Sequence, residues 1–167
     1  MSASADDGGQ SGGRGDATQP PTEVLLAVSL FRASALLTGE LDRELQEATG
    51  FGLSEALVII QIKAGRGRLK MADLADSLVI TRGGITKIVD RLVSGGFLDR
   101  VPSEEDRRVI YAEVTDKALE LLRAQQPIVD SVTERRLAAV LTEAELRQAT
   151  DVLRRVLAEN PGWEPSS

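Results

Sequence analysis

The 167-residue sequence contains no cysteine and no histidine. The chain therefore cannot form a disulfide, a thiol redox switch, a cysteine nucleophile, a Cys/His zinc site or a Ser-His-Asp triad. No uninterrupted apolar run approaches about 18 residues, and the N-terminal residues lack the apolar core of a signal peptide. These absences predict a protein without a membrane span, located in the cytoplasm, and no cofactor or metal is expected.

Aromatic residues are also scarce, at 3%, although 42% of the residues are hydrophobic. A core of Leu, Val, Ile and Ala is therefore expected, and this mixture is typical of helices. The formal net charge is −6, which taken alone argues against a nucleic-acid partner. However, residues 60–110 hold ten Lys/Arg against seven Asp/Glu, a net +3, which leaves −9 for the remainder. This asymmetry hints at an anionic partner, although a stretch of +3 also arises by chance.

The two ends of the chain differ from its centre. Residues 1–21 are rich in Gly, Ser and Asp and are expected to form a disordered arm. Residues 22–50 predict one long amphipathic helix, and residues 115–160 predict two helices before a short tail, 161–167. Thr115 is the expected cap of the first of these, which should run to about Val140 and be kinked or interrupted at Pro127; Thr142 and Glu145 have the spacing of a capping box for the second.

The central segment, residues 51–114, alternates short helical and strand-like patterns. The predicted elements are, in chain order, a helix 55–64 capped by Ser54, a brief strand around Leu69, a helix 71–78, a helix 81–94 capped by Thr81, and strands 97–101 and 109–114. Two helices joined by a tight turn and followed by a hairpin with a charged tip form a winged helix-turn-helix. The predicted fold is therefore mainly α with a small β-wing, flanked by long helices.

The helix 81–94 has two distinct faces. An inner face is predicted for Ile85, Ile88, Val89 and Leu92, and an outer face for Gly83, Thr86, Lys87, Asp90 and Ser94, with Arg82 and Arg91 at the flanks. A recognition helix reads bases from its N-terminal turns, where Lys or Arg pairs with guanine and Thr contacts a thymine methyl group. A glycine there would let the backbone approach DNA closely, which is the interpretation favoured for Gly83. For Gly84 it is no better than the alternative, in which the glycines only loosen the helix or relieve crowding.

The hairpin tip, residues 103–108, carries three acids beside two arginines. It could be an ordinary solvated turn. Alternatively, Asp106 could brace Arg108 or another arginine by an ion pair and leave one guanidinium free for the minor groove. The charges alone do not decide between these interpretations.

From about residue 23 to 158 the sequence resembles the MarR family of transcriptional regulators. The resemblance rests on L-A-D-S-L, on G-G-I-T-K-I-V-D-R-L-V-S-G-G-F-L-D-R and on E-D-R-R-V-I-Y-A-E-V-T-D-K-A. The Asp-x-Arg wing signature of the family falls on Asp106-Arg107-Arg108. Lys70, where the family usually has a Ser or Thr cap, and Ala118, where it usually has Gly, depart from the pattern without threatening the fold.

The resemblance implies a homodimer with intertwined terminal helices that binds double-stranded, pseudo-palindromic DNA. It makes Arg108 the candidate for the minor groove and Asp106 its brace. Most members are repressors released by a small-molecule effector bound between the dimerisation helices and the winged unit; the residues that would line this pocket vary and are not predicted. The candidate DNA-contacting residues are Thr81, Arg82, Gly83, Thr86, Lys87, Arg91, Arg107 and Arg108.

Two other functions are weaker interpretations. A winged-helix protein-interaction module without DNA binding should lack the cations Arg82, Lys87 and Arg108, which are present. An enzyme is disfavoured because the paired carboxylates Glu104 and Glu105 lie on an exposed tip, where burial cannot tune their pKa values. No phosphate-loop or dinucleotide spacing occurs in the sequence.

Overall fold

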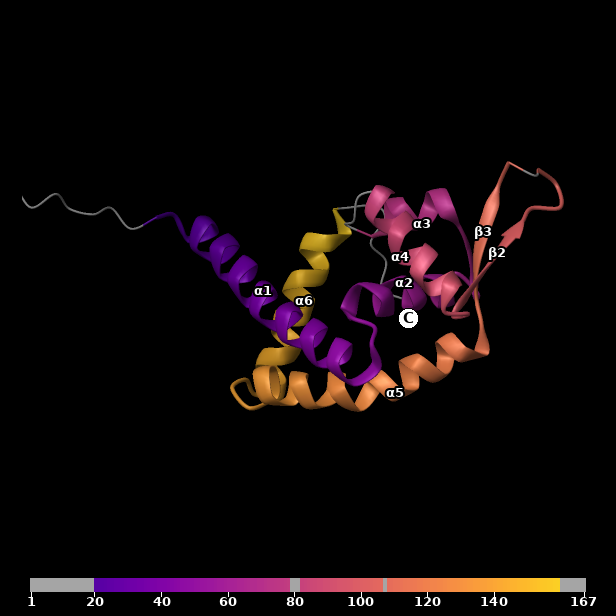
Figure 1. The fold of residues 1–167 in the computed structure, drawn as a ribbon. Coiled ribbons are helices and arrows are strands. Elements are labelled where there is room, and N and C mark those ends of the chain that lie inside the picture. Colours follow the sequence, from indigo (N-terminus) through magenta and orange to yellow (C-terminus); the bar gives the residue numbers. More distant parts are fainter. Residues whose placement is uncertain (1–19, 79–81, 107, 160–167) are drawn as a thin grey trace, which may run out of the picture. The chain divides into compact units, whose positions relative to one another are not determined.

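The computed structural model describes residues 20–78, 82–106 and 108–159, with the side chains of 75–77 and 82 excepted (Figure 1). The elements are α1 (Thr22–Thr49), α2 (Leu53–Ala64), β1 (Arg68–Lys70), α3 (Met71–Ser77), α4 (Arg82–Ser94), β2 (Leu98–Pro102), β3 (Ile110–Val114), α5 (Asp116–Thr133), the π-helical turn η1 (Glu134–Ala138) and α6 (Glu143–Ala158). The chain divides into two compact units, and the boundary after Ala33 falls within α1. The mainly helical fold with a small β-wing is confirmed. The predicted arm lies outside the described residues except for Pro20 and Pro21, and the predicted tail lies wholly outside them.

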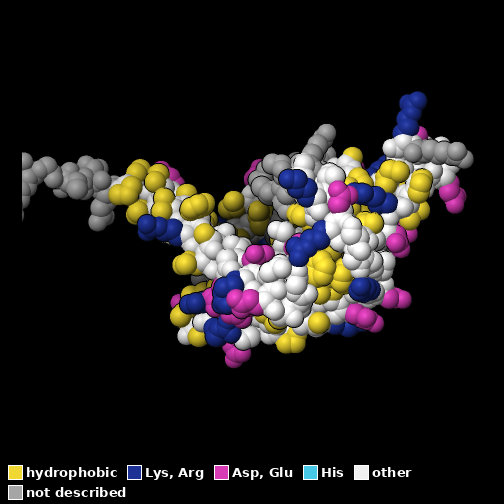
Figure 2. Space-filling view, viewed as in Figure 1, with side chains coloured by type: hydrophobic (Ala, Val, Ile, Leu, Met, Phe, Trp, Pro, Cys, Tyr) yellow, Lys and Arg dark blue, Asp and Glu magenta, His cyan; other side chains and the backbone are white. Residues whose placement is uncertain are grey.

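The part of α1 in the first unit exposes its apolar side chains (Figure 2). Val24, Leu25, Leu26 and Val28 are each about half exposed, and Phe31 is 76% exposed. By length and composition alone, α1 could cross a membrane. The prediction of no membrane span rested on the lack of an unbroken apolar run, whereas α1 passes the test of length and composition because it intersperses only a few polar residues. Such an apolar helix is weak evidence for a membrane, and a face that packs against another protein chain has the same composition.

The second unit is organised around a three-stranded antiparallel sheet in the order β1-β3-β2. Leu69 pairs with Ala112 of β3, which in turn pairs with Arg100 of β2. Strand β1 confirms the brief strand expected around Leu69. Because β3 is central, the hairpin that it forms with β2 is fixed to the helical body through β1, at the start of α3.

The core lies between this sheet and α2, α3, α4 and the start of α5. Its buried members are Val58, Ile59, Ile62, Leu74, Ile85, Val89, Leu92, Phe97, Leu98, Ala112, Ala118 and Leu121. The predicted inner face of the helix 81–94 is confirmed: three of its four residues are buried, and Ile88 packs against the same cluster. Ala118 is completely buried, which explains why a small residue is required at this position even though it is not glycine.

Several predicted helix ends are confirmed and two are corrected. Thr115 caps α5 by accepting a hydrogen bond from the Ala118 N–H, and Thr142 and Glu145 form the expected capping box. Helix α2 begins earlier than predicted: Gly52, not Ser54, is the cap, because the Glu55 carboxylate accepts its N–H at 3.1 Å. Helix α5 continues through Pro127 to Thr133, so the predicted interruption there is wrong, and the π-helical turn η1 follows it.

An ion-pair cluster joins the second half of α1 to η1. Arg135 contacts Glu40 at 3.1 Å and Glu44 at 2.9 Å, and Arg136 also pairs with Glu40. Hydrogen bonds from Arg136 and then Arg135 hold the pKa of Glu40 below its ordinary value. Because this carboxylate is ionised more readily in the folded chain, its contribution to stability is present above the ordinary carboxyl pKa and lost as the pH falls through the lowered value.

Replacing Glu40 by Gln is therefore expected to lower the free energy of unfolding at neutral pH. The difference from the wild-type chain should narrow as the pH falls below about 4, the range in which an ordinary Glu is protonated. Urea unfolding followed by circular dichroism at several pH values measures both effects. A difference that stays constant down to pH 3 would show that the charge of Glu40 is not the cause.

Candidate nucleic-acid interface

Helix α4 presents a thin outer surface at its beginning. Gly83, Thr86 and Lys87 are exposed, opposite the buried residues Ile85 and Val89. The helix starts at Arg82, whose side chain is not described, and Thr81 lies outside the described residues. The outward orientation predicted for Gly83, Thr86 and Lys87 is thus confirmed, while Arg82 and Thr81 stay predictions.

The two glycines of α4 occupy different environments. A Cβ atom built on Gly83 would meet nothing within 4 Å, so packing within the chain does not require glycine there. Gly84 is half-buried, nearer to the helix packing, as expected. A glycine that internal packing does not require, at the N-terminal turn of an exposed helix face, is consistent with close approach by an external molecule.

Further along α4, two consecutive residues tie the helix to different elements. Asp90 pairs with Arg100 of β2 at 2.7 Å, which fixes the helix to the wing. The neighbouring Arg91 pairs with Glu55 of α2 at 2.6 Å. Lys87, one turn earlier, forms no ion pair with any side chain that the structure describes. Its charge is therefore available to an external anion.

Arg91 has intramolecular partners that the sequence interpretation did not anticipate. Besides Glu55, its guanidinium donates to the Gly50 carbonyl and lies 4.9 Å from the centroid of the Phe51 ring. An arginine at the flank of a recognition helix suggested a DNA contact, but here the donors are directed at α2 and at the segment before it. The structure gives the Arg91 guanidinium intramolecular partners although its side chain is exposed, and a contact from it to DNA stays a prediction.

The wing is ordered by its own polar groups. The Ser103 hydroxyl accepts the Glu105 N–H at 3.3 Å, and Asp106 Oδ1 accepts the backbone N–H of Arg108 at 2.9 Å. Asp106 thus braces the main chain of Arg108, and no ion pair joins it to a described guanidinium. The brace expected at this residue is directed at the main chain of Arg108, and an ion pair of Asp106 with another arginine stays a prediction. Arg107 lies outside the described residues.

Arg108 lies in the hairpin tip of the wing, between β2 and β3. With Arg100, Met71 and Ala72 it lines a hollow of about 540 Å³ beside the first turn of α3. Arg108 is exposed, so both its charge and that of Arg100 border this surface. Asp90 compensates Arg100, whereas Arg108 has no described carboxylate within ion-pair distance.

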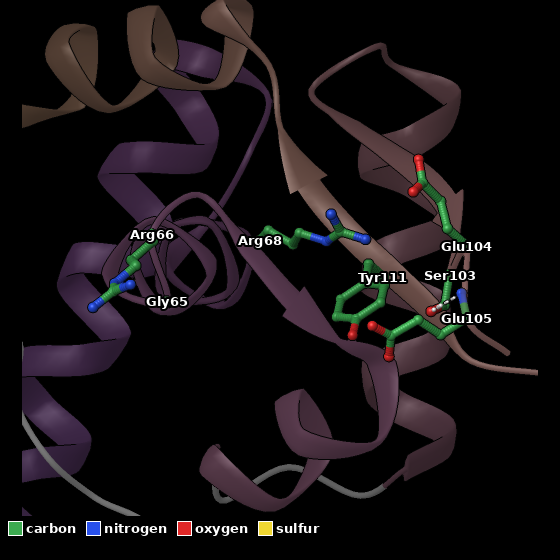
Figure 3. A pocket seen from close by; sticks show the side chains of 7 residues that line it. All are labelled: Gly65, Arg66, Arg68, Ser103, Glu104, Glu105 and Tyr111. Carbon is green, nitrogen blue, oxygen red and sulfur yellow. Dashed lines mark hydrogen bonds between the residues drawn. The ribbon is translucent and has the colours of Figure 1, made fainter.

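A second hollow, of about 460 Å³, lies beside the wing (Figure 3). Arg68 stacks 4.0 Å from the centroid of the Tyr111 ring and pairs with Glu113 on the neighbouring strand at 3.3 Å. Glu104 and Glu105 approach from the wing, while Arg66 points away from the ring (Figure 3). Since two arginines and two glutamates line this hollow, it offers no concentrated charge of one sign.

The arrangement of α2, α3, α4 and a β-hairpin is a winged helix-turn-helix, a class of DNA-binding fold. A sequence model of the MarR family matches residues 49–109. The chain is 31% identical over 99 residues to MhqR, an HTH-type transcriptional regulator of Bacillus subtilis (strain 168). The matched region covers 59% of this chain and 67% of MhqR. On this evidence the chain belongs to the MarR family.

Two further similarities extend beyond the winged unit. The chain is 26% identical over 141 residues to MprA, a transcriptional repressor of Escherichia coli (strain K12), covering 83% of this chain and 78% of MprA. The crystal structure of Sco3205, a MarR family transcriptional regulator from Streptomyces coelicolor in complex with DNA, has a TM-score of 0.71 at 28% identity, covering 83% and 88% of the two chains. The relatives are transcription regulators, not enzymes.

We expect Gly83→Ala to stabilise the folded chain by roughly 0.5–1 kcal/mol, because Ala loses less backbone entropy in a helix and its Cβ meets nothing here. Gly52→Ala is the matched control. Its Cβ would lie 2.2 Å from Asp42 Oδ1, so this variant should be destabilised. Urea unfolding measures both changes, and a destabilised Gly83→Ala variant would contradict the open surroundings of Gly83.

Proposed function

We propose that this chain is a homodimeric transcriptional repressor that binds a pseudo-palindromic operator through α4 and the wing. Gly83, Thr86 and Lys87 form the face that enters the major groove, together with Arg82 and Thr81 at the start of the helix. Arg108, with Arg107 beside it, reaches the flanking minor groove. One observation carries the proposal. Gly83 is a glycine at an exposed position where no contact within the chain requires one, and it lies one turn before Lys87, which has no ion-pair partner among the described side chains.

Charge supports this assignment of the binding surface. The whole chain is acidic, but residues 60–110 carry a net +3. Two acids near the surface are also occupied internally: Asp90 by Arg100, and Asp106 by the main chain of the wing. The ion pair with Arg100 offsets the charge of Asp90 and so reduces repulsion of phosphate close to Lys87, and the acidic remainder keeps non-specific binding weak.

A dimer is supported by apolar surface on the helices outside the winged unit. On α6, Leu153 and Val156 are 39% and 56% exposed, and α6 has no buried residue. The apolar residues of the first part of α1 are likewise exposed. Burying such side chains is favourable by about 25 cal/mol per Å², so a second copy of the chain is the proposed cover for these helices. This role also accounts for the apolar composition of α1 without a membrane.

The amino-acid composition limits which signal could release the protein from DNA. Without cysteine, thiol oxidation cannot release the protein from DNA, and without histidine a zinc signal is disfavoured. The proposed signal is therefore a small-molecule effector. Because the proposed partner is DNA, the proposed location of the protein is the cytoplasm.

Lys87→Ala is expected to weaken binding to the operator by about 1–3 kcal/mol if the lysine contacts a base. Arg108→Ala should weaken binding and lower the slope of log K against log salt by about 1, because it removes a cation near phosphates. Fluorescence anisotropy with a duplex that the wild-type chain selects from a random library measures both. Arg123→Ala, an equal loss of charge on α5, is the control. If Lys87→Ala and Arg108→Ala both bind the duplex as tightly as the wild-type chain, this binding surface is refuted. If the wild-type chain selects no duplex, a protein-interaction module is favoured instead.

The proposed dimer predicts a particle of about twice the 17.9 kDa chain mass in sedimentation equilibrium. Val156→Glu should dissociate it, because dimerisation would bury an unpaired carboxylate at a cost of several kcal/mol. Gln148→Glu adds the same charge on the polar side of α6 and should leave the dimer intact. A wild-type monomer, or equal effects of the two variants, would contradict the assigned interface.

A further inference from the structure

Residues 49–52, here called the α1–α2 junction, form a tightly bonded turn. Gly50 adopts a φ of 77°, in the left-handed region, and its carbonyl accepts the side-chain amide of Gln46 at 2.9 Å. Gly52 leaves no room for a side chain beside Asp42, whose carboxylate accepts the Leu53 N–H at 2.8 Å. These bonds fix the shape of the junction, so a helix that bonds to the junction is fixed relative to it.

Helix α4 holds the junction from one side through Arg91. The guanidinium reaches the Gly50 carbonyl, the Glu55 carboxylate and the face of the Phe51 ring. Phe51 in turn packs edge-on against Phe97, with ring centroids 4.6 Å apart, and Phe97 follows the end of α4. Because Glu55 is 7% exposed, its pairing with Arg91 is shielded on the carboxylate side and less weakened by water than a surface pair.

Helix α5 holds the same junction from another element through Gln125. This side chain is 2% exposed, and its Nε2 donates to Thr49 Oγ1 at 3.0 Å and to the Phe51 carbonyl at 2.9 Å. Its Oε1 atom is buried without a partner among the described residues. A buried amide that gives both bonds to one turn is costly to leave unpaired, so it resists displacement of that turn.

We propose that Arg91 and Gln125 are positioning residues that couple helix α5 to the recognition helix α4 through the α1–α2 junction. This inference rests on the proposed function and deepens it, because it assigns Arg91 an action on DNA affinity without a contact to DNA. Displacing the junction moves the anchor of α4, and the outer face with Lys87 loses its alignment with the groove. A change in α5 is transmitted to α4 by the same path.

The test compares Glu55→Gln, Arg91→Gln, their double variant and Gln125→Leu in the full-length chain. The probe is the duplex selected from a random library by the wild-type chain, titrated at several salt concentrations. All measurements are made at a temperature where circular dichroism shows every variant to be folded. Glu47→Gln, which makes the same charge change at an exposed residue of α1, is the matched control.

A positioning role and a direct contact give opposite results for Glu55→Gln. If Arg91 positions α4, losing Glu55 lowers affinity by about tenfold, the equivalent of one charge-assisted hydrogen bond. Arg91→Gln does the same, the double variant is no worse than either single variant, and the salt slope stays at the wild-type value. Gln125→Leu also lowers affinity at unchanged slope, and hydrogen exchange becomes faster in α4 in all four variants.

Two results would overturn the inference. If Glu55→Gln retains or gains affinity while Arg91→Gln loses it with a smaller salt slope, the freed guanidinium contacts phosphate directly. If Glu55→Gln and Gln125→Leu bind as well as wild type, the junction serves stability alone. In both cases wild type still binds the duplex and Lys87→Ala still weakens it, so these failures differ from failure of the proposed function, in which the wild-type chain selects no duplex.

Discussion

Burial of the inner face of α4 is the constraint on which the rest of the winged unit depends. Ile85, Val89 and Leu92 are almost completely inaccessible, and they fill the space between α2 and the sheet. With this face fixed at a period of 3.6 residues, the opposite face has no freedom in its direction. Gly83 and Lys87 therefore face outward as a consequence of the core and require no contact of their own to hold them there.

Ion pairs add to the anchoring of α4 that the core provides. Asp90 and Arg91 are neighbours on α4, yet their partners, Arg100 and Glu55, belong to β2 and α2. The helix is thus anchored on two flanks by pairs that also neutralise charges of either sign. Among the described side chains, Lys87 and Arg108 have no ion-pair partner, so both cations stay available at this surface. An acidic protein can therefore present a locally basic face without a large excess of basic residues.

The sequence predicted local features well because their causes are local. Apolar spacing located the inner face of α4, and the caps at Thr115 and Thr142 were visible as short motifs. Neither the intramolecular partners of Arg91 nor the main-chain hydrogen bond of Asp106 was predicted. Arg91 meets Glu55 across 36 residues, and no spacing rule connects such positions. For Asp106, charge favoured a guanidinium as partner, but the tight turn brings the backbone N–H of Arg108 closer.

Glu55 uses its two carboxylate oxygens for different tasks: one accepts the Gly52 N–H at the start of α2, and the other receives Arg91. The start of one helix and the anchorage of another are therefore held by a single side chain. A substitution at this position cannot adjust either without disturbing the other. Across related chains, positions 55 and 91 should accordingly change together, so that a lineage that loses the acid at 55 would also have to rebuild both the cap and the anchor.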